Sequence, residues 1–364
     1  MKPHLFAAAL LLGACVPRAS AEMGSKYKID MYGSIKTDFI YSDHGTLTNE
    51  YRTYTTSGRE DRAFRISSRA TRFGFDISVS SNVAGKIEAD FLGLTDSLSG
   101  TAGTVSDLRL RHAYATVTIG KTEFLVGQTY YPITADIPET LNDYYLGNSG
   151  ALWSRAPQLR ATYKPAEKLK LIAAVTRPTG KLTDAEGTHS ALPGFQGKIE
   201  QQLGKARVSL AGAVGAWKNT SSQTADISVL VAAFNVPYSI FTAYGEAWKG
   251  RNLTDFLGGL GNLNYGAKAV PSEGGYLAFK VKPEDDLWFT AAYGVDNPDN
   301  SRVQITTVNS KTRNSTAFAN VVTRLYDCVE AGFETAALVT QYKGAAGLYE
   351  RSSMNYQLTV KLLF

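Results

Sequence analysis

The chain is poor in cysteine and histidine. Its 364 residues include 2 cysteines and 4 histidines. Cys15 lies in an apolar run at the start of the chain, so removal of that run would leave Cys328 alone, and a single cysteine cannot form an internal disulfide. No histidine or cysteine spacing fits a metal site, and no phosphate-binding loop occurs. The sequence therefore predicts no metal and no cofactor, and stability must come from backbone pairing.

Strong net charge is also missing. The formal charge is +5, and loss of Lys2 and Arg18 with the first residues would take two from it and leave +3. Such a small excess does not indicate a nucleic-acid partner.

The first residues have the pattern of an export signal. A basic head with Lys2 is followed by the apolar run 5–16, which is too short to span a membrane as a helix. Ala19-Ser20-Ala21 fits a cleavage site, so we expect a signal peptide at 1–21 and one domain at 22–364. Alternatively, Leu12-Gly13-Ala14-Cys15 resembles a lipobox, which would lipidate Cys15. Either way the chain is exported, and no later run is long and apolar enough for a spanning helix.

The last residues alternate strictly between polar and apolar side chains. From Met354 to Phe364 every second residue is apolar, while Asn355, Gln357, Thr359 and Lys361 occupy the other face. A period of two indicates a strand with one apolar and one polar side, and about ten residues is the length of a tilted strand that crosses a bilayer. A terminal Phe resembles the assembly signal of Gram-negative outer-membrane barrels, whereas the alternative is the last strand of a soluble sandwich.

Strand-like segments recur along the whole chain, and their connections alternate between short and long. Short turns at one end and long loops at the other are typical of a bacterial outer-membrane barrel, and sixteen strands leave room for a water-filled lumen. We therefore predict an all-β fold, a 16-stranded antiparallel transmembrane β-barrel with short periplasmic turns and long extracellular loops. The predicted strands are 27–41, 71–80, 84–94, 108–120, 122–132, 154–164, 169–176, 192–203, 205–217, 225–236, 238–249, 275–282, 287–295, 314–326, 329–342 and 352–364.

Four segments of the first half carry a resemblance to a known family. Leu108-Arg109-Leu110-Arg111-His112-Ala113-Tyr114 and Leu125-Val126-Gly127-Gln128-Thr129-Tyr130 resemble the corresponding run of DcaP-like outer-membrane porins, as do 70–75 and 85–91. The resemblance implies a trimer, and the wider porin superfamily implies a third long loop folded into the lumen. DcaP-like proteins usually carry an N-terminal coiled coil, and no heptad segment precedes Tyr27.

That loop, 133–153, follows the fifth predicted strand and is acidic and aromatic. By analogy with the porin superfamily, basic side chains of the early strands should face it across a pore constriction. An alternative is that these basic residues only brace the loop by pairing with its acids. The candidates are Asp136, Glu139 and Asp143 on the loop, and Arg72, Lys86, Arg109, Arg111 and Arg160 on the wall.

The function predicted from these features is that of a porin, which lets small hydrophilic solutes and ions diffuse passively, with a bias towards anionic ones. The expected partners are outer-membrane lipid, two further copies in a homotrimer, and the barrel-assembly machinery through Phe364. An enzyme is not expected, because Asp43-His44 and His189-Ser190 are sequence neighbours that should point in opposite directions on a strand. The alternatives are a barrel hydrolase and a plugged structural or adhesive barrel.

Overall fold

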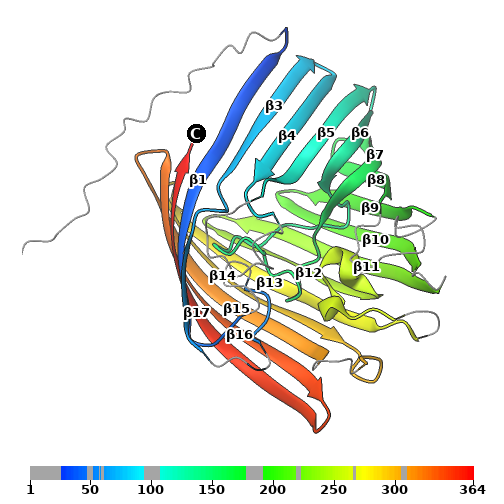
Figure 1. The fold of residues 1–364 in the computed structure, drawn as a ribbon. Coiled ribbons are helices and arrows are strands. Elements are labelled where there is room, and N and C mark those ends of the chain that lie inside the picture. Colours follow the sequence, from blue (N-terminus) through cyan, green and yellow to red (C-terminus); the bar gives the residue numbers. More distant parts are fainter. Residues whose placement is uncertain are drawn as a thin grey trace, which may run out of the picture.

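The computed structural model is a single antiparallel sheet that closes on itself (Figure 1). It describes residues 26–46, 52–56, 58, 61–93, 107–177, 192–218, 223–264, 268–304 and 310–364. The strands are β1 (Lys28–Ser42), β2 (Ala63–Ser67), β3 (Arg72–Ser80), β4 (Val83–Asp90), β5 (Arg109–Ile119), β6 (Thr122–Tyr130), β7 (Arg155–Ala166), β8 (Leu169–Thr176), β9 (Gly194–Leu203), β10 (Ala206–Lys218), β11 (Thr224–Tyr238), β12 (Phe241–Arg251), β13 (Pro271–Glu284), β14 (Leu287–Pro298), β15 (Ser310–Leu325), β16 (Val329–Gly344) and β17 (Gly347–Leu363).

The sheet closes because β1 pairs with β17 on one side and with β2 and β3 on the other. β2 and β3 lie end to end beside β1, so the 17 strand segments fill sixteen positions of the barrel. The predicted fold class, a closed 16-stranded antiparallel barrel, is thus confirmed.

Two connections differ from the prediction. The predicted first loop contains β2, whose Phe64 and Ile66 face outward beside the end of β1. The connection between β16 and β17, expected to be long, is a two-residue turn, because the ladder runs on to the pair Gly344 and Gly347. Gly347 has a φ of +118°, a conformation that a residue without Cβ adopts at little cost.

Side chains alternate between the two faces of the barrel wall as the pattern predicts. On β17, Tyr356 and Leu358 are 40% and 47% exposed outward, whereas Asn355 and Gln357 are 0% and 1% exposed on the lumen side. An apolar outer face with a polar inner face is what a barrel in lipid requires. The charged residues of the strands are therefore available to line the lumen.

The chain ends meet at the seam between β1 and β17. Gly33 exchanges two backbone hydrogen bonds with Phe364, at 2.9 and 3.2 Å. A Cβ on Gly33 would lie 2.5 Å from the Phe364 ring, so the glycine makes room for that ring. The terminal aromatic residue thus packs directly on the strand that closes the barrel.

A buried apolar cluster lies inside the lumen and joins two long loops to the wall. One loop connects β6 to β7, and the other connects β12 to β13 and contains η2 (Leu253–Phe256) and η3 (Gly259–Gly261). Their apolar side chains pack on Trp217, Val229, Val231 and Trp248 of β10–β12. The lumen is therefore partly filled by loops held by a core of their own.

In the part of the chain that the structure describes, no helix is long and apolar enough to cross a membrane. The expected signal peptide at 1–21 and the possible lipid site Cys15 lie outside the described residues. Cys328 lies in the turn between β15 and β16, whereas Cys15 is outside the described residues. That Cys328 is the one cysteine of a chain that has lost residues 1–21 stays a prediction.

Candidate pore constriction

The segment Ile133–Trp153, here called the constriction loop, folds into the lumen between β6 and β7. Its three acidic residues reach three separate parts of the wall. Asp136 pairs with Arg207 of β10, and Glu139 pairs with Lys280 of β13 at 2.7 Å. Asp143 reaches β1 and β3. The prediction that this loop enters the lumen is confirmed.

Asp143 is the most enclosed of the three acids. Its carboxylate lies 2.5 Å from the Lys36 Nζ of β1 and 3.5 Å from a terminal nitrogen of Arg72 on β3. Burial by itself raises the pKa of Asp143, but the charges of Lys36 and Arg72 outweigh burial and bring the pKa below its ordinary value. The carboxylate is therefore ionised at neutral pH and ties the loop to the seam side of the barrel.

Glu334 of β16 holds the loop at a point that the sequence did not reveal. Its carboxylate accepts hydrogen bonds from the Thr140 hydroxyl and the Leu141 N–H, each at 2.8 Å. Arg52, from the loop after β1, pairs with the same carboxylate at 3.0 Å, and both side chains are 1% exposed. One buried carboxylate therefore fixes two loops to the wall, and no local sequence signal marks it.

Arg109 and Arg111 lie on the wall beside the loop and pair with carboxylates of the neighbouring strand. Arg109 binds Asp90 with two hydrogen bonds of 2.9 and 2.6 Å. Arg111, where the β4–β5 register shifts, binds Glu88 at 2.5 Å and Asp90 at 2.8 Å. Arg109 and Arg111 therefore pair with carboxylates of the wall, whereas Arg72 is the predicted basic residue that reaches a loop acid, Asp143.

Lys86 and Arg160, the other two predicted wall residues, bind elsewhere. Lys86 donates to Asp76 at 2.9 Å and lies over the Tyr32 ring at 4.4 Å. Arg160 donates to the Gln158 side-chain oxygen at 2.7 and 3.0 Å and to the Tyr130 carbonyl. Arg160 thus hydrogen-bonds neutral oxygens, and the carboxylate that acts on its charge is that of Glu123 on the neighbouring strand β6.

Arg155, at the start of β7, is a second cation of this kind, and the sequence reasoning missed it. It donates to the Tyr130 hydroxyl at 2.9 Å and lies over the rings of Tyr130 and Trp153, at 5.0 and 5.6 Å. The positive charges of Arg109 and Arg111 repel its guanidinium group. Its position directly after the loop could have pointed to it.

A cavity of about 520 Å³ lies between the constriction loop and this wall. Lys36, Arg72 and Arg111 line it from the early strands, and Lys361 and Glu330 from the late ones. Charged side chains of both signs thus surround a space that is large enough for a small solute. Charges are costly in a dry interior, so this arrangement fits a water-filled lumen.

Neither a metal site nor a hydrolytic dyad is evident in the described ranges. They contain no group of three His, Cys, Asp or Glu side chains that could hold a metal ion. His44 does approach Asp43, at 3.2 Å, although sequence neighbours were expected to diverge. The Ser353 hydroxyl nearby donates to the His44 carbonyl and not to the ring. His189 lies outside the described residues.

Comparison with solved structures shows what this arrangement is similar to. The outer-membrane channel DcaP of Acinetobacter baumannii superposes with a TM-score of 0.78 at 21% identity, over 93% of this chain and 99% of the channel. The fold is similar to that of DcaP. The resemblance to DcaP-like porins predicted from the sequence is therefore confirmed for the fold.

Two other structures share the fold more loosely. The anion-selective porin of Comamonas acidovorans has a TM-score of 0.64 at 10% identity, over 93% of this chain and 100% of the porin. OmpT, an outer membrane protein of Vibrio cholerae, has a TM-score of 0.61 at 14% identity, over 93% of this chain and 98% of OmpT. No family model and no curated protein sequence matches the chain.

Proposed function

We propose that the chain is an outer-membrane channel through which small hydrophilic solutes and ions diffuse passively. The observation that carries the proposal is the constriction loop, which crosses a closed sixteen-stranded barrel beside charged walls. A lumen narrowed by a loop and lined by fixed charges selects solutes by size and charge. The names of the DcaP channel and of the Comamonas porin, which describe those proteins, support this function.

We further propose that the channel favours anions. Arg155 and Arg160 hydrogen-bond neutral oxygens, and with Arg109 and Arg111 they make four arginines on this wall against the three carboxylates of Glu88, Asp90 and Glu123. Fixed charges act over about 8 Å at physiological salt, a distance comparable to a narrow pore. The wall beside the loop therefore presents a positive potential to a passing solute.

The test is single-channel recording in planar bilayers with a salt gradient. We expect discrete conductance steps and a reversal potential of the sign that indicates anion preference. Changing Arg155 and Arg160 to Gln should move the reversal potential towards cations, whereas Lys249→Gln, on the outer surface, should not. A folded barrel without conductance would refute the channel and favour a plugged structural barrel, since loops fill part of the lumen. Conductance without anion preference would refute only the selectivity.

The barrel fold and its similarity to outer-membrane channels also support a proposal on export and assembly. We expect export by the signal peptide at 1–21, insertion into outer-membrane lipid by the assembly machinery through Phe364, and a homotrimer. One of the solved OmpT structures is described as a trimer form. Light scattering in detergent should give three times the mass of one chain, and a monomer mass would refute the trimer.

A further inference from the structure

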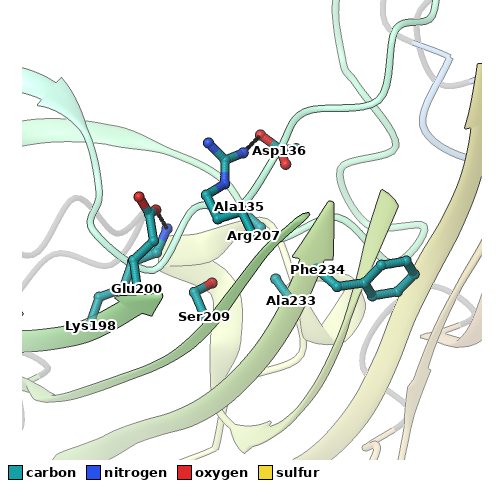
Figure 2. A pocket seen from close by; sticks show the side chains of 8 residues that line it. All are labelled: Ala135, Asp136, Lys198, Glu200, Arg207, Ser209, Ala233 and Phe234. Carbon is teal, nitrogen blue, oxygen red and sulfur yellow. Dashed lines mark hydrogen bonds and ion pairs between the residues drawn. The ribbon is translucent and has the colours of Figure 1, made fainter. Parts of the chain in front are cut away.

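A second cavity, of about 210 Å³, lies where the constriction loop begins, against β9, β10 and β11 (Figure 2). Its polar lining comes from Asp136 of the loop, Lys198 and Glu200 of β9, and Arg207 and Ser209 of β10. The cavity is separate from the larger one beside Arg72 and Arg111, because the two share no lining residue.

The charges of this second cavity are balanced. Arg207 pairs with Asp136, and the Lys198 Nζ lies 3.8 Å from Glu200 Oε2. Figure 2 shows the two pairs on either side of the Ser209 side chain. The cavity therefore presents two cations and two carboxylates, in contrast to the arginine-rich wall of β5–β7.

Several polar atoms around the cavity remain available for a ligand. Among the described contacts, Arg207 bonds through one terminal nitrogen only, so its Nε and other terminal nitrogen have no protein acceptor. The Ser209 hydroxyl has no hydrogen-bond partner among the residues that the structure describes. Glu200 Oε1 accepts from Lys170 at 2.8 Å, whereas Oε2 is 3.8 Å from Lys198, which is too far for a hydrogen bond. Donors thus lie on the β10 side and an open acceptor on the β9 side.

We propose that this cavity is a binding subsite for small zwitterions that carry an ammonium and a carboxylate group, such as free α-amino acids. The solute carboxylate would accept hydrogen bonds from Arg207 and Ser209, and its ammonium would donate to Glu200. A plain anion would meet the carboxylates of Glu200 and Asp136, and a plain cation would meet Arg207 and Lys198. Each is therefore opposed by a like charge that a zwitterion compensates. This inference rests on the proposed channel function, which brings solutes to the cavity.

The experiment compares three probes on the detergent-solubilised full chain by saturation-transfer NMR titration. The probes are L-alanine, propionate, which lacks the ammonium, and ethylamine, which lacks the carboxylate. We expect alanine to bind at least tenfold more tightly than either. Glu200→Gln should weaken alanine binding about tenfold and leave propionate binding equal or stronger, because a charge-assisted hydrogen bond is lost to the ammonium alone. Ser209→Ala should weaken alanine binding about fivefold.

Matched controls separate binding from a merely structural role. Glu273→Gln removes a carboxylate that pairs with Lys249 at 3.3 Å on the exposed surface, and it should not change alanine binding. Equal binding of alanine and propionate, or equal loss of both in Glu200→Gln, would overturn the proposal. Ser209→Ala breaks no ion pair, so it supplies the test if Glu200→Gln does not fold. If the channel conducts ions but binds alanine no more tightly than propionate and ethylamine, this subsite alone is refuted. If alanine binds more tightly but no conductance is found, the channel alone is refuted.

Discussion

Glu334 offers the sharpest test of how the loops are held inside the barrel. Glu334→Leu would leave the Arg52 guanidinium buried without its carboxylate, although Gln357 Oε1 would still accept from it at 2.6 Å. It would also remove the acceptor of the Leu141 N–H and of the Thr140 hydroxyl. Breaking a buried ion pair from one side costs about 3–5 kcal/mol, so we expect a loss of stability of that size.

The pairing itself can be isolated by a double-mutant cycle with Arg52→Met. That single change leaves Glu334 its other donors, so it should cost less, about 1–3 kcal/mol. The double variant removes both charges and leaves the Leu141 N–H and the Thr140 hydroxyl without that acceptor, which costs about 2–4 kcal/mol for the two. The double variant should therefore be more stable than Glu334→Leu alone, with a coupling energy of about 3 kcal/mol, at the upper end of the range for contacting residues.

The assay is urea unfolding in lipid vesicles, followed by tryptophan fluorescence, together with single-channel recording. The weakened loop attachment should also raise open-channel current noise in Glu334→Leu. Glu330→Leu is the matched control on the same strand, because its partners Arg324 and Lys361 are 39% and 33% exposed. Exposed pairs contribute at most about 1 kcal/mol. A coupling energy below about 0.5 kcal/mol, or an equal loss in the control, would refute the reasoning.

Three further predictions concern the wall, the loop and the seam. Changing Arg109 and Arg111 to Gln should move the reversal potential towards cations, because the wall carboxylates they neutralise become uncovered; an unchanged potential would mean that they only brace the strands. The pKa of Asp143 lies below its ordinary 3.8, so its tether is present above that value and is lost as the pH falls through the lower, folded-state pKa. Current noise should rise only below about pH 4 in the wild type and already at neutral pH in Asp143→Asn; a wild-type rise near neutral pH would contradict this. Gly33→Val should lower the temperature at which heating shifts the gel mobility of the barrel, because the new side chain crowds the Phe364 ring. Deletion of Phe364 should lower the cellular yield of folded barrel but not the conductance of refolded protein. A normal yield of the truncated protein would count against an assembly role for Phe364.

Within an unbroken stretch of strand, the face that a residue takes could be predicted from sequence, because the period of two is local, whereas the register shift at Arg111 on β5 reverses the alternation beyond it. The alternation from Met354 to Phe364 places Gln357 inward and Leu358 outward, and the structure agrees. The same parity brings Arg109 and Arg111 together at Asp90. The entry of the constriction loop into the lumen was predicted by family resemblance and not by the residues themselves.

Which charged side chains pair with one another was decided only by the closed barrel. Arg52 and Glu334 are 282 residues apart, and they meet because β17 pairs with both β1 and β16 once the seam has closed. Strand register likewise decides that Arg111 reaches Glu88 on its neighbour strand and that Lys36 takes Asp143 from the loop. Alternation along a strand depends on the backbone of that strand alone, whereas contacts across the lumen depend on the register of every strand between the partners. The sequence by itself therefore determined the wall and its two faces, and the tertiary structure determined which charges are neutralised.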